Sequence, residues 1–410
     1  MLEPYRVLDL TDARGYFCGK ILADVGADVL KVDRPAGGPQ QSSGPAGQSD
    51  LHPDTDLPWL AYNANKRGIS LDLEHETGRR LFCQLARSAD VVVESFPPGY
   101  LASLELDYDR LAAINPKLIV ASITGFGQRG PYANYRAPDL VVAAMSGQMH
   151  HTGEADGPPL RMSVPQAYLN ACTDAALAIL IALWHRRRSG LGQHIDAAAQ
   201  RSMLWFAAYG IPHWQMQHQL LGRVGQRRAG LQRGKLVRQL WPCKDGFVCF
   251  TLIGGQSGAR SNRPLTQWME EAGFADDFLR GLDWDAFDMA TCSPELADVI
   301  EGQIAKFFLA HSIEDLYLGA TTRRIMLYPV ASPRELVDDA QLQAREFWSD
   351  VEHPESGSEV RYPGSFVKST AVSLAMRRRA PMLGEHNREV YRELGIDEEH
   401  LATLREDGVI

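Results

Sequence analysis

The feature that most constrains the fold is a strand–helix–strand pattern near the start of the chain. Residues 6–10 (RVLDL) form a short apolar run, residues 28–32 (DVLKV) form a second one, and residues 16–25 between them have helical spacing. Two such runs joined by a helix predict parallel strands with a right-handed crossover. Residues 90–93 (DVVV) and 118–123 (LIVASI) predict further strands. We therefore expect an α/β fold with a Rossmann-like parallel sheet.

The length of the chain, 410 residues, exceeds what one hydrophobic core normally holds, so two domains are expected. The character of the sequence changes near residue 225, because residues 226–238 are basic and contain glycine, and residues 244–246 (KDG) predict a hairpin turn. We expect a large Rossmann-like domain from residues 1–224, a smaller α+β domain from residues 225–330, and a segment, residues 331–410, that returns to the large domain.

The composition argues against several classes of protein. The net charge is −9 and no basic stretch alternates with aromatic residues, so we expect no nucleic-acid partner. The six cysteines are dispersed without metal-ligand spacing, which favours reduced thiols and no metal site. The longest apolar run, residues 175–184, is much shorter than the about 20 residues that a bilayer span needs. With no apolar signal core at the N-terminus, we expect a cytoplasmic protein without a membrane partner.

A long helix is predicted after Ser163. Pro165 suits its first turn, and residues 186–188 (RRR) place positive charge at its carboxyl end before Gly190. Nearly every side of this helix is apolar between those ends, so we expect it to be buried.

A glycine pattern later in the chain invites a dinucleotide interpretation that we reject. Residues 125–130 (GFGQRG) match GxGxxG and follow a predicted strand. That motif binds pyrophosphate only when its glycines open a helix. Pro131 follows at once and residues 132–138 have no helical periodicity. We expect a glycine-rich loop at the carboxyl end of a strand.

Seven segments, in order along nearly the whole chain, carry a family resemblance: residues 6–11 (RVLDLT), 22–35 (LADVGADVLKVDRP), 63–73 (NANKRGISLDL), 89–99 (ADVVVESFPPG), 115–132 (NPKLIVASITGFGQRGPY), 186–196 (RRRSGLGQHID) and 380–387 (APMLGEHN). Together they resemble family III CoA-transferases, the group of formyl-CoA transferase and of carnitine and bile-acid CoA-transferases. The resemblance implies a large domain formed by both chain ends and a dimer of interlocked, ring-shaped subunits. It also implies coenzyme A or acyl-CoA as a substrate, with no tightly bound cofactor.

The resemblance implies contacts with CoA at four positions: Arg34 near the nucleotide, Leu71 and Phe96 beside the adenine, and Arg136 on the phosphate side. Other positions depart from the family pattern: Glu74 stands where lysine is common, Ser95 replaces an asparagine, and Ser103 replaces a frequent arginine. Each lost cation removes a charge-assisted bond to phosphate, which predicts weaker CoA affinity or an altered pose. Taken singly, Arg34 also suits a surface charge, Phe96 a core side chain and Arg136 a loop cation.

The family's nucleophile is absent. In the family an aspartate near the start of the long helix attacks the acyl-CoA thioester and forms a mixed anhydride. Tyr168 occupies that position here. A phenol with a pKa near 10 is about 0.1% ionised at pH 7, so the role of Tyr168 in catalysis is doubtful. Asp174 lies on another side of the helix, and we expect it to make a polar interaction inside the fold.

Other positions keep the character of the family. Gly254 and Gly255 resemble a glycine loop that closes over the acyl group, although a simple turn is the alternative. Arg14 offers a fixed positive charge to an oxyanion or carboxylate, or is a surface arginine. The family's racemase branch needs a histidine where Pro138 stands, which excludes that chemistry. The neighbouring Asp139 suits a bond to loop backbone.

Three functions fit these observations. The first is an active CoA-transferase that moves CoA between an acyl-CoA donor and a carboxylic acid, with another residue or a substrate carboxylate replacing the aspartate. The second is a non-catalytic subunit of a heteromeric CoA-transferase of the benzylsuccinate type, whose partner supplies the aspartate. The third is an acyl-CoA-binding protein. The expected assembly is a homodimer, or a heterodimer with an aspartate-bearing paralogue.

Overall fold

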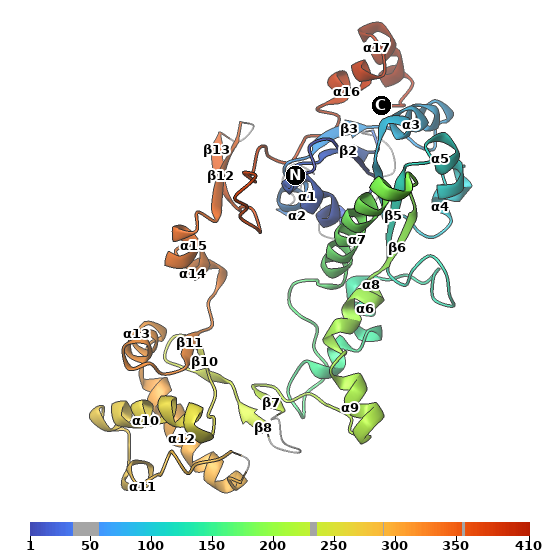
Figure 1. Cartoon of the computed structure of the whole chain (residues 1–410). Coiled ribbons are helices and arrows are strands. Elements are labelled where there is room, and N and C mark those ends of the chain that lie inside the picture. The colour runs from blue at the N-terminus through green and yellow to red at the C-terminus, as the bar shows by residue number, and fades with distance from the viewer. Residues whose placement is uncertain (36–56, 230–235, 290, 355–356) are drawn as a thin grey trace. The chain divides into compact units, whose positions relative to one another are not determined.

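The computed structural model describes residues 1–35, 57–229, 236–289, 291–354 and 357–410. Residues 36–56, part of a segment rich in Gly, Ser, Pro and Asp for which the sequence predicts a long surface loop, lie outside the described residues. The chain divides into two units. The larger unit contains Met1–Met149, Arg161–Leu220 and Gln341–Ile410, and the smaller unit contains His150–Leu160 and Leu221–Ala340. Each unit is described by itself (Figure 1).

A parallel sheet of six strands forms the centre of the larger unit (Figure 1). Its strands are β1 (Arg6–Asp9), β2 (Asp28–Asp33), β3 (Arg67–Ser70), β4 (Val91–Glu94), β5 (Ile119–Thr124) and β6 (His194–Ala198). Their order in the sheet is β3-β2-β1-β4-β5-β6, and every neighbouring pair is parallel. The predicted α/β fold class is confirmed. Because the chain reverses direction across the sheet between β1 and β4, a crevice is expected outside the carboxyl ends of those two strands.

Helices cover both faces of this sheet, which explains why its strands are apolar on both sides. Helices α1 (Tyr16–Asp24) and α7 (Ala167–Ser189) pack on the face that presents Val7, Val91 and Ile119. Helices α3 (Glu76–Ser88) and α5 (Tyr108–Ile114) pack on the other face. That second core also contains residues of the C-terminal helices α16 (Asn387–Glu393) and α17 (Glu398–Glu406).

The C-terminal segment is tied to the edge strand β3. The backbone N–H of Ser70 donates to Asn387 Oδ1 at 2.9 Å, and the Tyr391 hydroxyl donates to Ser70 O at 2.7 Å. Arg67 pairs with both Glu389 and Glu393. Both ends of the chain therefore build the larger unit.

Helix α7 differs from its prediction. It begins at Ala167 and ends at Ser189, but it is not buried on all sides, so the prediction of a buried helix is wrong. Leu177, Ile181 and Trp184 form a row on one face, and their exposed fractions are 57%, 57% and 61%. By length and composition α7 could cross a bilayer, yet half of its most apolar window is buried in the unit, as in the core helix of a soluble protein.

The remaining elements of the larger unit are short. They are α2 (Leu57–Asn63), α4 (Tyr100–Ser103), α6 (Asp139–Met145), α8 (Ala199–Met203), α9 (Gly210–Gln217), the 3-10 helix Leu204–Phe206, α15 (Ala340–Ala344), and the hairpin of β12 (Trp348–His353) and β13 (Ser358–Pro363). The 3-10 helix Gln148–His151 spans the point in the chain at which the two units divide.

The smaller unit has an α+β composition. An antiparallel sheet has the order β11-β10-β9, and a hairpin joins β7 to β8. These strands are β7 (Arg227–Ala229), β8 (Leu236–Arg238), β9 (Leu240–Pro242), β10 (Phe247–Phe250) and β11 (Leu327–Pro329). The helices are α10 (Gly255–Glu271), α11 (Asp277–Arg280), α12 (Pro294–Ala310), α13 (Ile313–Arg323) and α14 (Pro333–Val337). Trp241, Phe250 and Phe308 pack edge to face in its core.

Candidate active site

Two loops meet at the carboxyl ends of β1 and β4, where the sheet order reverses. The backbone N–H of Asp12 donates to Ser95 Oγ at 2.9 Å. The Ser95 hydroxyl in turn donates to Asp12 Oδ1 at 3.0 Å. One hydroxyl therefore joins the loop that follows β1 to the loop that follows β4. This is the position in an open parallel sheet where ligands bind.

Arg14 is held as a fixed cation in the first of these loops. Its Nε and Nη2 donate to the Asp12 carboxylate, the latter at 2.6 Å, and Nη2 also donates to Ser95 O at 2.8 Å. Burial opposes its charge, but the hydrogen bonds and the charge of Asp12 outweigh burial and raise the pKa of Arg14. Its side chain is 38% exposed. Arg14 is therefore a preorganised cation that a ligand can reach.

Tyr168 lies in the first turn of α7. Its hydroxyl donates to Ala137 O at 2.6 Å, and the residue is 8% exposed. Burial raises the pKa of the Tyr168 phenol, and the neighbouring Arg14 guanidinium offsets this only in part. The Tyr168 hydroxyl therefore keeps its proton at neutral pH and donates it in a hydrogen bond to Ala137 O. In this arrangement the Tyr168 oxygen is not a nucleophile.

Neither aspartate near Tyr168 in sequence replaces the missing carboxylate. Asp139 accepts from the backbone N–H of Ala167 at 2.7 Å and so caps the start of α7, in agreement with the backbone role considered for it. Asp174 is exposed on the surface of the unit. The expected polar interaction of Asp174 inside the fold is therefore wrong.

Glu94 is a buried carboxyl group that the sequence analysis did not single out. It is the last residue of β4, is 4% exposed, and accepts from the backbone N–H of Phe96 at 2.7 Å. Burial raises the pKa of Glu94 to about 7, against hydrogen bonds from Ser122 and Phe96. An acidic residue directly after three valines was the available signal. Glu94 shapes the loop that carries both Ser95 and Phe96.

Arg34, a predicted CoA contact, is paired with acidic side chains. Its Nη2 contacts the carboxylates of Glu74 and Asp72. The Tyr100 hydroxyl donates to the other oxygen of Glu74 at 3.1 Å. The hydrogen bond that Arg34 donates to Glu74 is the main cause of the raised pKa of Arg34. The charge of Arg34 is therefore already compensated at the position that the family resemblance places near the nucleotide.

The other predicted CoA contacts lie at different depths. Phe96 is half-buried and packs on Tyr100, with ring centroids 4.6 Å apart. Leu71 is 2% exposed and belongs to the core, which leaves its backbone as the part that borders the strand end. Arg136 is exposed in the segment between β5 and α6. Their contacts with CoA stay predictions.

The two glycines of the expected lid belong to the smaller unit. Gly254 lies directly before α10, where a Cβ atom would come within 2.7 Å of Asp288 Cα. Gly255 has a φ of +71° with open space around its Cα. A side chain is therefore excluded at Gly254 by space and disfavoured at Gly255 by backbone conformation.

The loop of residues 125–130 follows β5, and the chain forms turns and bends rather than a helix until α6 begins at Asp139. Gly127 N donates to Thr124 Oγ1, and Gln128 N donates to Asp196 Oδ2. These amides are therefore used within the sheet edge, which supports rejecting a dinucleotide motif.

A cavity of about 510 Å³ lies at the opposite, amino ends of β4 and β5. Arg186 lines it and donates to Asp90 Oδ1 at 2.7 Å and to Lys117 O at 2.9 Å. These contacts hold the end of α7 to the two strand starts. The cavity is separate from the candidate active site.

Comparison with known proteins identifies the family. A sequence model of CoA-transferase family III matches residues 2–387, and the chain belongs to that family. It is 33% identical to the succinyl-CoA:(R)-benzylsuccinate CoA-transferase subunit BbsE of Thauera aromatica, covering 99% of this chain and 97% of that one. It is 32% identical to a formyl-CoA:oxalate CoA-transferase of Streptomyces avermitilis, covering 100% and 99%.

A solved structure has the same fold. The crystal structure of a CAIB/BAIF family protein from Brucella suis matches with a TM-score of 0.79 and 27% sequence identity. The match covers 95% of this chain and 98% of that one.

Proposed function

We propose that this protein takes part in moving CoA between an acyl-CoA donor and a carboxylic acid. The observation that carries the proposal is the junction of two loops at the reversal of the sheet, where Arg14 is held as an accessible cation. Such a cation can stabilise the negative charge that develops on a thioester oxygen, or bind a substrate carboxylate. We call the region of Arg14 and Tyr168 the acyl end, and the region of Arg34 and Glu74 the nucleotide end.

The reaction needs a carboxylate that attacks the thioester. Its oxygen bonds to the thioester carbon, the C–S bond breaks, and CoA leaves as a thiolate while a mixed anhydride remains. Tyr168 does not supply this group, because its hydroxyl donates to Ala137 O. If the protein is active alone, the attacking group is then another carboxylate of this chain or a carboxylate of the substrate.

A second candidate function follows from the same observation. The chain acts as the non-catalytic subunit of a heteromeric CoA-transferase whose partner supplies the aspartate. The similarity to a protein named as a subunit, BbsE, favours this alternative. The exposed apolar row of Leu177, Ile181 and Trp184 gives a second chain a surface to cover. In both cases we expect a dimer, acting in the cytoplasm.

One experiment separates these functions. The full-length protein is purified alone and after co-expression with an aspartate-bearing paralogue, and each sample is incubated with succinyl-CoA and a panel of carboxylic acids. New CoA thioesters are detected by mass spectrometry. Exchange by the protein alone supports the first function, and exchange only in the co-expressed sample supports the second. If neither sample exchanges CoA, calorimetry measures the binding of acyl-CoA to each sample. Binding without exchange leaves an acyl-CoA-binding protein, and no binding in either sample contradicts all three functions.

A further inference from the structure

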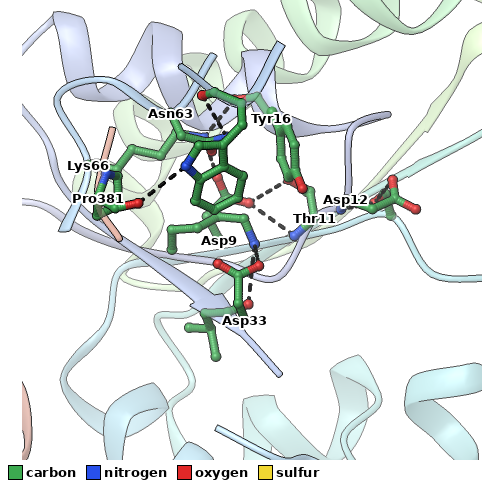
Figure 2. A network of polar contacts seen from close by, with 12 residues as sticks. Asp9, Thr11, Asp12, Tyr16, Asp33, Asn63, Lys66 and Pro381 are labelled. Carbon is green, nitrogen blue, oxygen red and sulfur yellow. Dashed lines mark hydrogen bonds and ion pairs between the residues drawn. The ribbon is translucent and has the colours of Figure 1, made fainter. Parts of the chain in front are cut away.

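A buried ion pair between Asp9 and Lys66 lies beside the segment of Thr11 and Asp12 (Figure 2). Asp9 at the end of β1 and Lys66 just before β3 are both fully buried, and their charged atoms are 2.7 Å apart. Burial opposes ionisation of Asp9, but the ammonium groups of Lys66 and Lys31 hold the pKa of Asp9 below its ordinary value. Sequence reasoning passed over both residues, although Lys66 lies in one of the segments that carry the family resemblance.

The contacts of Lys66 reach both ends of one loop. Its ammonium group donates to Asp9 Oδ2 at 2.7 Å, before the loop, and to Tyr16 O at 2.8 Å, after it. The third proton goes to Asn63 Oδ1 at 2.8 Å. An ammonium group carries three protons, so all of its donors are used. We call this arrangement the Lys66 clamp.

Asp9 connects Lys66 to the first residue of the loop, Thr11. Its second oxygen, Oδ1, accepts from the backbone N–H of Thr11 at 3.0 Å and from the Thr11 hydroxyl at 2.6 Å. The loop then closes through Gly15 N, which donates to Asp12 O at 2.8 Å. Asp12 is the residue that holds the Arg14 guanidinium. A continuous chain of contacts therefore leads from the Lys66 ammonium to the accessible cation.

Helix α1 packs directly on this ion pair. A Cβ atom at Gly19 would lie 2.2 Å from Asp9 Oδ2 and 2.9 Å from Lys66 Nζ. Only glycine lets the helix approach so closely. A buried ion pair is a costly way to stabilise a fold, and an apolar pair of similar volume is often as stable. The geometry thus favours a role in fixing one conformation of the loop rather than in stability alone.

We propose that Lys66 is a positioning residue: by clamping both ends of the Thr11–Gly15 loop, it sets the position of Arg14 against the acyl group. This inference rests on the proposed function, because it assigns Arg14 to the acyl end of a CoA thioester. The nucleotide end does not depend on the clamp, since Arg34 and Glu74 lie beyond β2 and β3.

The test uses the double variant Asp9→Asn/Lys66→Met in the full-length protein, because Lys66→Met alone would leave a buried carboxylate unpaired. Calorimetry measures affinity for CoA and for succinyl-CoA. We expect affinity for succinyl-CoA to fall by about tenfold or more, the value of a lost charge-assisted contact, while affinity for CoA changes less than about twofold. In an Arg14→Gln background the double substitution should add less than about twofold. Equal losses for both ligands, or a fully additive loss, would overturn the proposal.

Two further variants keep the test decisive. The double variant Asp24→Asn/Lys20→Met is the matched control, because Lys20 is a second buried lysine, in α1, and its ammonium pairs with Asp24. It should leave the ratio of the two affinities unchanged. Thr11→Val removes the hydrogen bond that the Thr11 hydroxyl donates to Asp9. It should shift the ratio of the two affinities in the same direction as Asp9→Asn/Lys66→Met, but by less. It replaces Asp9→Asn/Lys66→Met if that protein does not fold.

A measurement without ligand separates this proposal from the proposed function. Hydrogen exchange of the peptide spanning residues 10–17 should be about tenfold faster in Asp9→Asn/Lys66→Met, and unchanged in Asp24→Asn/Lys20→Met. If the native protein binds neither CoA nor succinyl-CoA, the proposed function fails, and the clamp is judged by exchange alone. Unchanged exchange in the double variant contradicts the clamp whatever the ligand does.

Discussion

At the acyl end Arg14 is fixed by Asp12 and by a backbone carbonyl, yet its side chain is 38% exposed, whereas at the nucleotide end Arg34 is paired with Glu74 and Asp72. Both cations have acidic partners, but the partners do different work. Asp12 belongs to the same loop as Arg14 and orients it. Glu74 comes from the segment after β3 and occupies a position where the family often has a second cation. The acyl end is organised to bind an anion, whereas the nucleotide end already contains the carboxylate of Glu74.

The acyl end gives the largest expected effect. Tyr168→Asp places a carboxylate where the family has its nucleophile, next to the fixed charge of Arg14. We expect CoA exchange by the isolated protein to rise by on the order of a thousandfold or more, since loss of a nucleophile usually costs at least that much. Exchange of succinyl-CoA with labelled succinate measures the gain.

The control for this substitution is Tyr168→Phe, which removes the bond to Ala137 O without adding a carboxylate. It should leave exchange at the level of the native protein. If Tyr168→Asp still binds succinyl-CoA but exchanges no faster than Tyr168→Phe, the acyl end lacks more than a nucleophile, and the contrast between the two ends has to be redrawn.

The loop that carries Ser95 and Phe96 gives the next largest effect. The pKa of Glu94 in the folded protein, about 7, is above the ordinary value of 4.5. A raised pKa means that its contribution to stability is present below pH 4.5 and is lost as the pH rises through 7. Between pH 4.5 and 8 the native protein should lose about 3 kcal/mol of unfolding free energy relative to Glu94→Gln.

Urea denaturation of both proteins across this pH range measures the difference. The glutamine keeps an oxygen that can accept from Phe96 N, so the loop should keep its shape. If the unfolding free energies of the two proteins changed with pH in the same way, Glu94 would ionise at its ordinary pKa. The loop of Ser95 and Phe96 would then not be held by a neutral carboxyl group.

The nucleotide end gives the smallest effect. Glu74→Lys releases Arg34 from its acidic partner and adds a second cation. We expect the Kd for CoA to fall about tenfold at low salt and by less at high salt, because both groups are partly exposed. Glu3→Lys, an exposed substitution before β1, makes the same change in net charge and should leave the Kd unchanged. A lower Kd in both variants would mean that net charge, not the pairing of Arg34, limits binding.

Much of the fold could be predicted from the sequence because its signals are local. The apolar runs of β1, β2, β4 and β5 and the carboxyl end of α7 before Gly190 lie where they were expected. The amino end of α7 does not, because the helix begins at Ala167 and leaves Pro165 outside its first turn. The exposed face of α7 was not predicted, because the sequence shows that a side chain is apolar but not whether its own unit or another molecule covers it. Leu177, Ile181 and Trp184 show this directly.

The polar contacts of the site were harder to predict because they join residues distant in the sequence. The position of Tyr168 could be predicted from the family pattern, but its bond to Ala137 O could not. Ser95 was expected to be a weakened contact, and the structure gives it a role in holding Asp12. Lys66 and Asp9 are separated by 57 positions, and only the folded sheet brings them together.

The exposed row on α7 also makes dilution an experimental variable. Leu177 follows Tyr168 by nine residues, which corresponds to about 14 Å along the helix axis. A second chain that covers this row would therefore contact the same helix that carries Tyr168. If that chain dissociates at low protein concentration, one face of α7 loses its contacts, so turnover per chain should depend on the protein concentration.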